Sequence, residues 1–400
     1  MSDIPALSSE EKRVHRIDTL RQAADGVFKP LVDSVFLIVV IHFFSVGDFW
    51  KGLISASTFI GFFLSVPLTG MLYRSSVPRS RILMYLTFLS ALGMAAGTFS
   101  GSGIMFALSV TASSAAVSLR QPFFTDLYRE QYPAERRARQ ISLGLRLGQV
   151  VSLSMGLLYG RLLDVNLDSW RWITAAAILV FVFTGIELGR LPGRPVIPGR
   201  KPWLQALSIP FRNPVFLYIQ ASWMLIGFGN LWTLPLKVVY LSEEGRGLGL
   251  SPAMVTLIIV AIPSLMKLLF NPFWAGMYQK LSFPVFRISL NIFFMLSLGL
   301  FFLTGSLPLI ILASVFFGMG TSGSPFVWQL WVTRIAPADE TRVYQSAHAF
   351  LAGVRGVVAP FLGFAVLRQT SFRAMGLISA LLALVATLMI LPLLRRDRRS

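Results

Sequence analysis

Apolar runs of about 20 residues recur along the whole chain, and this pattern constrains the fold more than any other feature. A helix of that length crosses about 30 Å of hydrocarbon. A soluble domain of 400 residues with 54% hydrophobic residues could not cover so much apolar surface. The chain is therefore predicted to be an all-α membrane protein. Twelve transmembrane helices are expected at about 20–44, 52–73, 82–100, 103–125, 141–163, 171–190, 214–240, 252–272, 284–304, 307–330, 345–367 and 374–394.

Basic residues are distributed unevenly between the predicted loops. With the N-terminus inside, 24 lysines and arginines fall on the inner side and seven on the outer side. Because cytoplasmic loops are enriched in Lys and Arg, both termini are expected in the cytoplasm, in a bacterial-type inner membrane. The net charge of +18 is then explained by orientation and by contact with anionic lipid in the bilayer. No nucleic acid is expected as a partner.

Several kinds of chemistry are excluded or unsupported. The chain has no cysteine, which excludes disulfides, thiol nucleophiles and cysteine-ligated metals. Its histidines, His15, His42 and His348, form no ligand set with nearby acids, and no Gly-rich phosphate loop followed by Lys-Ser/Thr is present. Neither an enzyme activity nor a cofactor is expected. No cleaved signal peptide is recognised before the first span.

Two loops recur half a chain apart. The segment Gly70 to Arg81, GMLYRSSVPRSR, returns as Gly276 to Arg287, GMYQKLSFPVFR, at an offset of 206 residues. A second pair of loops repeats at an offset of 205, at which Arg137, Gln140 and Gly148 return as Arg342, Gln345 and Gly353. The Pro-Ala pairs that precede them, at Pro133 and Pro337, differ from this offset by one residue. Two independent loops with one long period indicate two pseudo-symmetric copies of a six-helix unit. The predicted parts are an N-terminal tail at 1–18, a six-helix bundle at 19–190, a basic linker at 191–212, a second six-helix bundle at 213–394 and a basic tail at 395–400.

Two six-span halves joined by a basic inner loop resemble the major facilitator superfamily over essentially the whole chain. In that family the inner loop after span two reads roughly Gly-x-Leu-Ala-Asp-Arg-x-Gly-Arg-Arg. The residues that fit this pattern are Gly70, Leu72, Arg79 and Arg81. Arg74 occupies the Asp position of the family and Val77 its second Gly. The resemblance implies secondary active transport by alternating access about a central site between the halves.

The loop Asp of the family pairs with cations on neighbouring helices and holds the outward-open state. Arg74 reverses this charge, and Asp126, at the inner end of span four, is the candidate partner in a swapped pair. The alternative is that Arg74 and Asp126 are two independent, solvated charges that do not pair. The predicted gating loop comprises Gly70, Arg74, Arg79, Arg81, Asp126, Gly276 and Lys280.

Ionisable residues within spans usually face a cavity or a partner, because their burial in lipid is costly. Asp33 and Arg355 are predicted near mid-membrane. Asp33 is the proton-coupling candidate, and Lys29, one helical turn away, is its expected partner. Arg355 is the strongest substrate-binding candidate because its guanidinium does not deprotonate. The predicted substrate-binding residues are Arg120, Gln149, Asn230, Lys267, Gln329, Arg355, Trp223 and Trp328, although tryptophans at such positions are also typical of packing.

Span five carries Gly144, Gly148, Ser152, Gly156 and Gly160 at strict four-residue spacing, so that small residues line one helix face. Both close packing and a face that slides during transport are consistent with this ridge. The Gly-Pro pair of the family's antiporter signature is missing from it.

The sequence thus predicts a secondary active transporter, proton-coupled and monomeric. The excess of cations within the spans favours a small organic substrate that is anionic or amphipathic. A lipid or lysolipid flippase and a multidrug efflux antiporter are the alternatives. The expected partners are the small-molecule substrate, the lipid bilayer and protons or another coupling ion.

Overall fold

The computed structural model describes residues 9–72, 77–132, 134–192, 208–332, 335–337 and 340–397. Every regular element in these ranges is helical, so the prediction of an all-α membrane protein is confirmed. Ten helical segments of this part of the chain are long and apolar enough to cross a membrane. A twelve-helix arrangement would add two segments to these ten, the run from α1 to α2 and helix α3. The total of twelve transmembrane helices stays a prediction.

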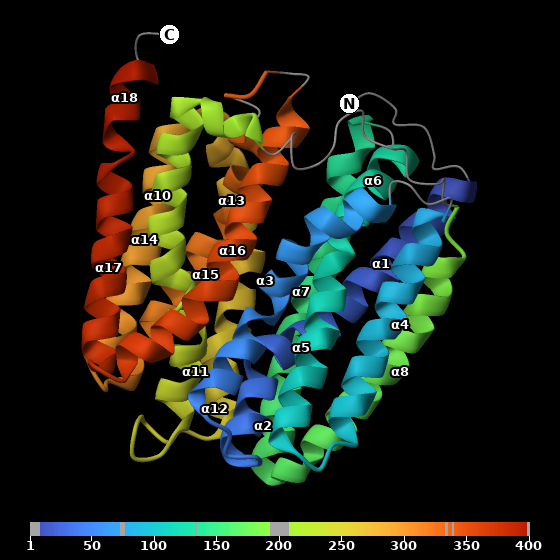
Figure 1. Ribbon diagram of the computed structural model, residues 1–400, viewed down its shortest axis with the longest axis vertical. Helices are drawn as coiled ribbons and strands as arrows, with labels where there is room; N and C mark the ends of the chain where they lie inside the picture. Colours follow the sequence, from blue (N-terminus) through green and yellow to red (C-terminus); the bar gives the residue numbers. More distant parts are fainter. Residues whose placement is uncertain are drawn as a thin grey trace.

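The first half of the chain forms one group of helices, coloured blue to green in Figure 1 and called here the N-terminal bundle. Helix α1 packs against α7 and α8, α4 packs against α5 and α8, and α3 packs against α5. The elements are α1 (Ser9–Pro30), η1 (Leu31–Val35), α2 (Phe36–His42), α3 (Asp48–Leu72), α4 (Arg79–Thr98), α5 (Gly103–Leu119), α6 (Gln121–Gln131), α7 (Ala134–Val165), η2 (Leu167–Ser169) and α8 (Trp170–Gly189).

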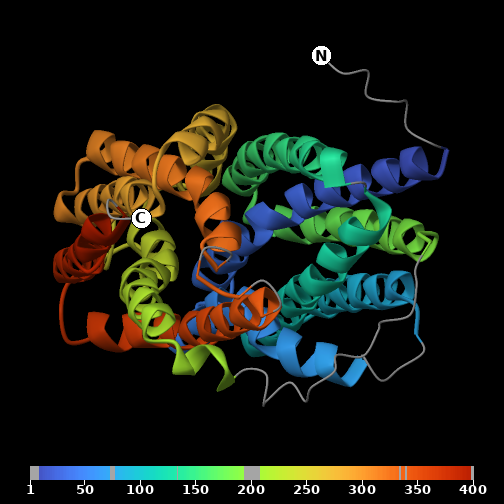
Figure 2. The ribbon, with the colours of Figure 1, turned by 90° about the horizontal axis from the view of Figure 1, so that it is seen from above.

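The second half forms the C-terminal bundle, which lies beside the first in both views (Figures 1 and 2). Helix α14 packs against α15 and α17, α13 packs against α15, and α10 packs against α16 and α17. The elements are η3 (Pro210–Arg212), α10 (Pro214–Leu231), α11 (Thr233–Ser242), α12 (Pro252–Thr256), η4 (Leu257–Ala261), α13 (Ile262–Lys280), α14 (Phe283–Leu303), α15 (Leu307–Leu330), α16 (Thr341–Leu367), α17 (Phe372–Leu388) and α18 (Leu391–Asp397).

Helix α1 begins earlier than the predicted first span. It starts at Ser9, inside the segment expected to be a tail, and Val14 and Ile17 are buried against an apolar cluster that includes Phe123 and Leu188. These contacts give the first turns of the helix an apolar face to bury, which explains why a polar-looking segment is helical.

A π-helical segment, η1, follows Pro30 and carries Asp33. Proline has no backbone N–H, so the regular ladder of hydrogen bonds is interrupted there, and a wider turn is one way to accommodate the interruption. A second π-helical segment, η4, ends two residues before Pro263 and contacts η1 across the boundary between the bundles.

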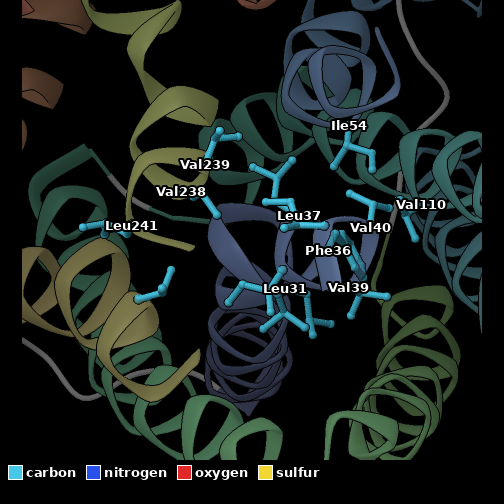
Figure 3. Packing of buried hydrophobic residues seen from close by; sticks show 14 of the residues in the cluster. Leu31, Phe36, Leu37, Val39, Val40, Ile54, Val110, Val238, Val239 and Leu241 are labelled. Carbon is cyan, nitrogen blue, oxygen red and sulfur yellow. The ribbon is translucent and has the colours of Figure 1, made fainter. Parts of the chain in front are cut away.

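The two bundles share one apolar core at the end of the molecule that holds α2. Six consecutive residues of α2, from Phe36 to Ile41, are buried. They pack in the same cluster as Val238, Val239 and Leu241 of α11 (Figure 3). A helix that is apolar on all sides is expected to be surrounded by other elements, and α2 meets that expectation.

Small residues bring helices of the two bundles close together. A Cβ on Gly353 of α16 would lie 2.8 Å from the backbone nitrogen of Phe63 in α3. The glycine ridge of α7 serves two contacts: Gly148 faces the backbone of Gln22 in α1, while Gly156 and Gly160 face η4 and α12 of the other bundle. The ridge therefore packs both within the N-terminal bundle and between the bundles.

Candidate functional site

Charged residues join the bundles at the end of the molecule that is predicted to face outward. Asp48 begins α3 and accepts hydrogen bonds from Arg246, at 3.0 and 3.3 Å, and from Arg368, at 3.5 Å. Lys51 is paired with Glu243, the residue that follows α11. We call these five residues the outer latch, because two belong to the N-terminal bundle and three to the C-terminal bundle.

The charges of the outer latch support one another. Burial would raise the pKa of the Asp48 carboxyl, but hydrogen bonds and charge from Arg246 outweigh it and hold this pKa below its usual range. The reciprocal pairing raises the pKa of Arg246 despite its partial burial. Both groups are therefore ionised at neutral pH in this arrangement.

A second charged group lies at the boundary between the bundles, where η1 contacts η4 and α12. Lys29 and Asp33 form the expected ion pair, with 2.7 Å between Nζ and Oδ2 and with 38% and 32% of their side chains exposed. Lys267 of α13 interacts electrostatically with both of them. Three predicted residues from opposite bundles, Lys29, Asp33 and Lys267, are thus brought together, and we call them the interface triad.

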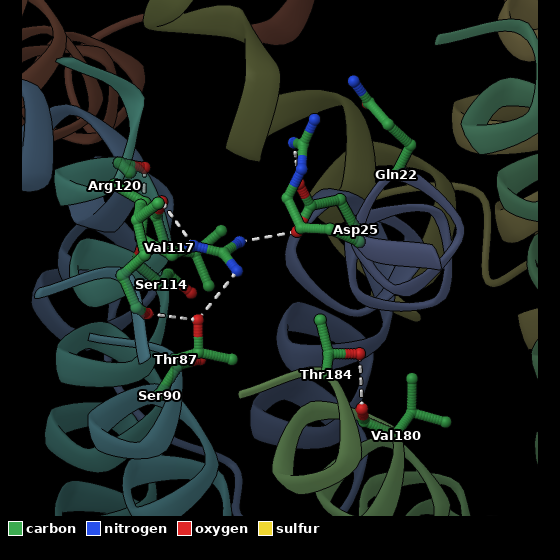
Figure 4. Close-up of polar contacts among 12 residues, drawn as sticks. Gln22, Asp25, Thr87, Ser90, Ser114, Val117, Arg120, Val180 and Thr184 are labelled. Carbon is green, nitrogen blue, oxygen red and sulfur yellow. Dashed lines mark hydrogen bonds and ion pairs between the residues drawn. The ribbon is translucent and has the colours of Figure 1, made fainter. Parts of the chain in front are cut away.

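Arg120 lies inside the N-terminal bundle, with 1% of its surface exposed. Its guanidinium donates to Asp25 Oδ1 at 2.5 Å and to Thr87 Oγ1 at 3.2 Å (Figure 4). Asp25 also accepts from Arg21, which pairs with Asp18. A buried cation needs such partners. The arrangement explains how Arg120 is tolerated, and its role in substrate binding stays a prediction.

Arg355 lies inside the C-terminal bundle, where it donates a short hydrogen bond to the carbonyl of Trp223. Gly227, one turn after Trp223 on α10, leaves room for it, since a Cβ there would lie 2.0 Å from the Arg355 Cζ. Trp223 and Trp328 are perpendicular, with ring centroids 5.9 Å apart, and both rings contact His348. The structure therefore brings the predicted residues Trp223, Trp328 and Arg355 together around this histidine.

The other predicted binding residues are separate from this group. Gln149 of α7 and Asn230 of α10 are half-buried, and a side-chain oxygen of each has no hydrogen-bond partner among the described residues. The side chain of Gln329 lies outside the described residues.

The predicted gating loop is described only at its edges. Arg74 and the side chain of Asp126 lie outside the described residues, so the swapped pair stays a prediction, and the surroundings of Gly70 are not described either. Arg79 is buried and Arg81 is exposed at the start of α4. In the second copy, Gly276 has open space around its Cα and Lys280 ends α13 in an exposed position.

Sequence reasoning missed Arg287 and His348 as site residues. Arg287 is 3% exposed, and its Cζ lies 3.4 Å from the centroid of the Trp223 ring. His348 is fully buried, and its Nδ1 lies 2.8 Å from Gln220 Oε1. The repeat carried the signal for Arg287, which aligns with Arg81, but nothing in the sequence showed that one copy would be buried and the other exposed.

This arrangement of helices is a fold that solved membrane transporters share. Solved structures that share the fold include a D-xylose-proton symporter (TM-score 0.72, 18% identity, 96% of this chain and 97% of that chain). They also include the nucleoside transporter NupG (TM-score 0.71, 11% identity, 96% and 99%). A third is a bacterial homolog of the human lysosomal transporter Spinster (TM-score 0.71, 14% identity, 98% and 98%). No curated protein sequence matches the chain.

The family model of the Major Facilitator Superfamily matches residues 233–400. The resemblance to this superfamily is therefore confirmed, by the sequence of the C-terminal part and by the fold of nearly the whole chain.

Proposed function

We propose that the protein is a secondary active transporter that moves a small organic substrate, anionic or amphipathic, by alternating access. The observation that carries the proposal is the interface triad. Its three charges lie within predicted spans, between the two bundles, and about a third of the Lys29 and Asp33 side chains is exposed. Charges at such a depth are typical of a water-filled substrate or ion pathway.

The net charge of the triad favours an anionic substrate. Lys29 and Lys267 supply two positive charges, and Asp33 supplies one negative charge. An anion that enters between the bundles would compensate the remaining positive charge of the triad. Asp33 is the proposed proton carrier, because its protonation would remove the charge that holds Lys29 and would leave the ammonium free for the substrate.

The outer latch supports an inward-facing arrangement of the bundles. The described ion pairs between the bundles gather at the predicted outer end. The Spinster homolog that shares the fold is in an inward-facing and occupied conformation. Alternation would then require the outer latch to open while contacts form at the opposite end, with both termini in the cytoplasm.

The test begins with ligand-dependent thermal shifts of the detergent-purified protein. The panel contains succinate, benzoate, ethidium and lysophosphatidylcholine, because a ligand that binds the native state raises its melting temperature. The best stabiliser is then offered, radiolabelled, to proteoliposomes preloaded with the unlabelled compound. We expect a carboxylate to be the compound that enters the preloaded proteoliposomes by counterflow. Counterflow of ethidium alone would favour multidrug efflux, and movement of the lysolipid alone would favour a flippase.

A Lys267→Gln variant sharpens this test, with Arg373→Gln as its control. Lys267 belongs to the interface triad, whereas Arg373 is exposed at the start of α17. We expect the half-saturating carboxylate concentration to rise at least about tenfold for Lys267→Gln, the equivalent of about 1.4 kcal/mol, and to stay unchanged in the control. Equal behaviour of the two variants would remove the triad from the substrate pathway.

A further inference from the structure

Three helices of the C-terminal bundle turn polar side chains toward Trp223. Helix α10 supplies Trp223 itself and Gln220, helix α14 supplies Arg287 and Asn291, and helix α16 supplies His348 and Arg355. Within each helix the two residues are three, four or seven positions apart, so they lie on one face. We call the five residues around Trp223 the basic cluster.

The contacts hold the basic cluster together tightly. The Arg287 guanidinium lies on the Trp223 ring, and Arg355 donates to the carbonyl of the same residue. His348 has its ring centroid 5.0 Å from that of Trp223. All three basic side chains are at most 5% exposed. They are therefore separated from bulk water, in an environment where charge–charge interactions are strong.

No acid compensates these charges within the described part of the chain. Neither Arg287 nor Arg355 forms an ion pair with any described carboxylate. The charge that acts on Arg287 is that of Arg355, and the charges that act on His348 are those of the two arginines. Removing charges from water without a counter-charge is expensive, so two adjacent buried arginines need a compensating anion.

The same place holds several hydrogen-bond donors without an acceptor. Arg287 Nη2, Arg355 Nε, Gln220 Nε2, Asn291 Nδ2 and Trp223 Nε1 are buried and have no partner among the described residues. Each unpaired buried donor costs about 1–3 kcal/mol. Such groups are rare in native proteins, and five of them on Trp223 and on nearby side chains of α10, α14 and α16 indicate an acceptor with several oxygens.

We infer that the basic cluster is an oxyanion-binding site, which takes the carboxylate or phosphate group of the substrate. The inference rests on the proposed function and goes beyond it: the interface triad lies on the path of the anion between the bundles, and the basic cluster is where its oxyanion group is held. The two guanidinium groups supply the charge, and the Gln220 and Asn291 amides supply neutral donors that fix the orientation. The Trp223 and Trp328 rings border the site and provide apolar surface for the rest of the substrate.

The test uses the full-length protein in detergent and measures anion binding by isothermal titration calorimetry and by tryptophan fluorescence. The probes are sodium phosphate and sodium benzoate, which separate a free phosphate ion from a carboxylate, with sodium chloride at equal ionic strength as the reference. We expect one of the two oxyanions to bind the wild type and to change its tryptophan emission. Absence of binding by both would overturn the inference.

Three variants locate the site. Arg287→Gln and Arg355→Gln should each weaken binding at least about tenfold, whereas Arg212→Gln, which changes an exposed arginine, should leave it unchanged. Gly227→Ala keeps every charge but displaces the Arg355 guanidinium, so it should weaken binding while the melting temperature changes little. Folded variants that bind with the affinity of the wild type would show that the arginines only pack against Trp223.

Transport measurements keep this inference separate from the proposed function. If the protein transports a carboxylate and the half-saturating concentration is the same in Gly227→Ala, the function stands and the inferred site is wrong. If the wild type binds the oxyanion and Arg355→Gln does not, but neither supports counterflow, the site stands and the transport proposal is wrong.

Discussion

Asp48 and Arg246 join the two bundles through two hydrogen bonds, of 3.0 and 3.3 Å. Asp48 begins α3, and Arg246 lies in the turn after α11, so the pair connects segments 198 residues apart. Arg368 adds a third contact to the same carboxylate. In an alternating-access cycle these contacts would exist only while the outer end is closed, which makes their strength a determinant of the resting conformation.

Asp48→Asn should shift the resting protein toward the outward-open state. Arg246 is 35% exposed, so the screened pair is worth about 1 kcal/mol, and its loss should change the ratio of conformations about fivefold. The measurement is the rate at which a membrane-impermeant maleimide labels Ser242→Cys, a buried position hydrogen-bonded to His42. The chain has no native cysteine, so this thiol is the only target.

The matched control for this variant is Asp168→Asn. Asp168 pairs with Arg171 on the same predicted side, but both belong to the N-terminal bundle. Its loss should not change the labelling rate. Faster labelling in both variants would mean that the effect is a general loosening of the structure.

Acid should open the outer latch through the same carboxylate. The pKa of Asp48 is lowered in the closed arrangement, because bonding to Arg246 outweighs burial. A lowered pKa contributes stability that is present above the ordinary carboxyl pKa, about 3.9, and that is lost as pH falls through the lowered value. Because maleimide reacts with the thiolate, the labelling rate of Ser242→Cys is divided by that of free cysteine at the same pH. This relative rate should be constant from pH 7 to about pH 4 and should rise below it.

Asp48→Asn provides the control for the acid effect, since it has no proton to gain at this position. In that variant the labelling rate relative to free cysteine should be high at neutral pH and should stay constant on acidification. A rise near pH 6 in the wild type would assign the opening to another group.

Asp25→Asn should destabilise the N-terminal bundle by about 3 kcal/mol, because it leaves the buried Arg120 guanidinium without its counter-charge. The additional change Arg120→Met should recover part of that loss, since it removes the buried charge as well. Thermal unfolding in detergent measures both effects. If Asp25→Asn instead keeps the wild-type melting temperature and raises the half-saturating substrate concentration, Arg120 contacts the substrate.

Alanine at the two ends of the glycine ridge should have different effects. Gly148→Ala brings a Cβ to 2.8 Å from the Gln22 carbonyl within one bundle, so it should lower stability by about 1–3 kcal/mol. Gly160→Ala brings a Cβ to 2.9 Å from Ala253 Cα of the other bundle. It should slow transport and speed labelling of Ser242→Cys, with a smaller change in melting temperature. Equal effects of the two changes would mean that the ridge is only a packing surface.

Hydropathy was sufficient to predict most of the helices, because each span must satisfy its own backbone in lipid. The predicted span at 171–190 corresponds to α8 (Trp170–Gly189), and the span at 284–304 corresponds to α14 (Phe283–Leu303). The Lys29–Asp33 pair was predictable for the same reason: residues four apart on a helix are neighbours whatever the rest of the fold does.

Contacts between distant helices were not predictable from the sequence alone. Arg120 is 95 residues from Asp25 along the chain, and nothing local indicates that α1 will turn this carboxylate toward the end of α5. Arg287 begins a span next to a basic loop, where an exposed cation is the usual outcome. Its burial depends on the packing of α14 against α10, which only the tertiary structure shows.

Proton-coupled transport is tested by accumulation of the best-stabilising carboxylate in proteoliposomes under an imposed pH gradient. We expect uptake above the external concentration, which a protonophore abolishes. We also expect that Asp33→Asn loses this accumulation but keeps counterflow, which needs no proton. Equal accumulation in Asp33→Asn, or uptake that the protonophore leaves unchanged, would contradict proton-coupled transport through the interface triad.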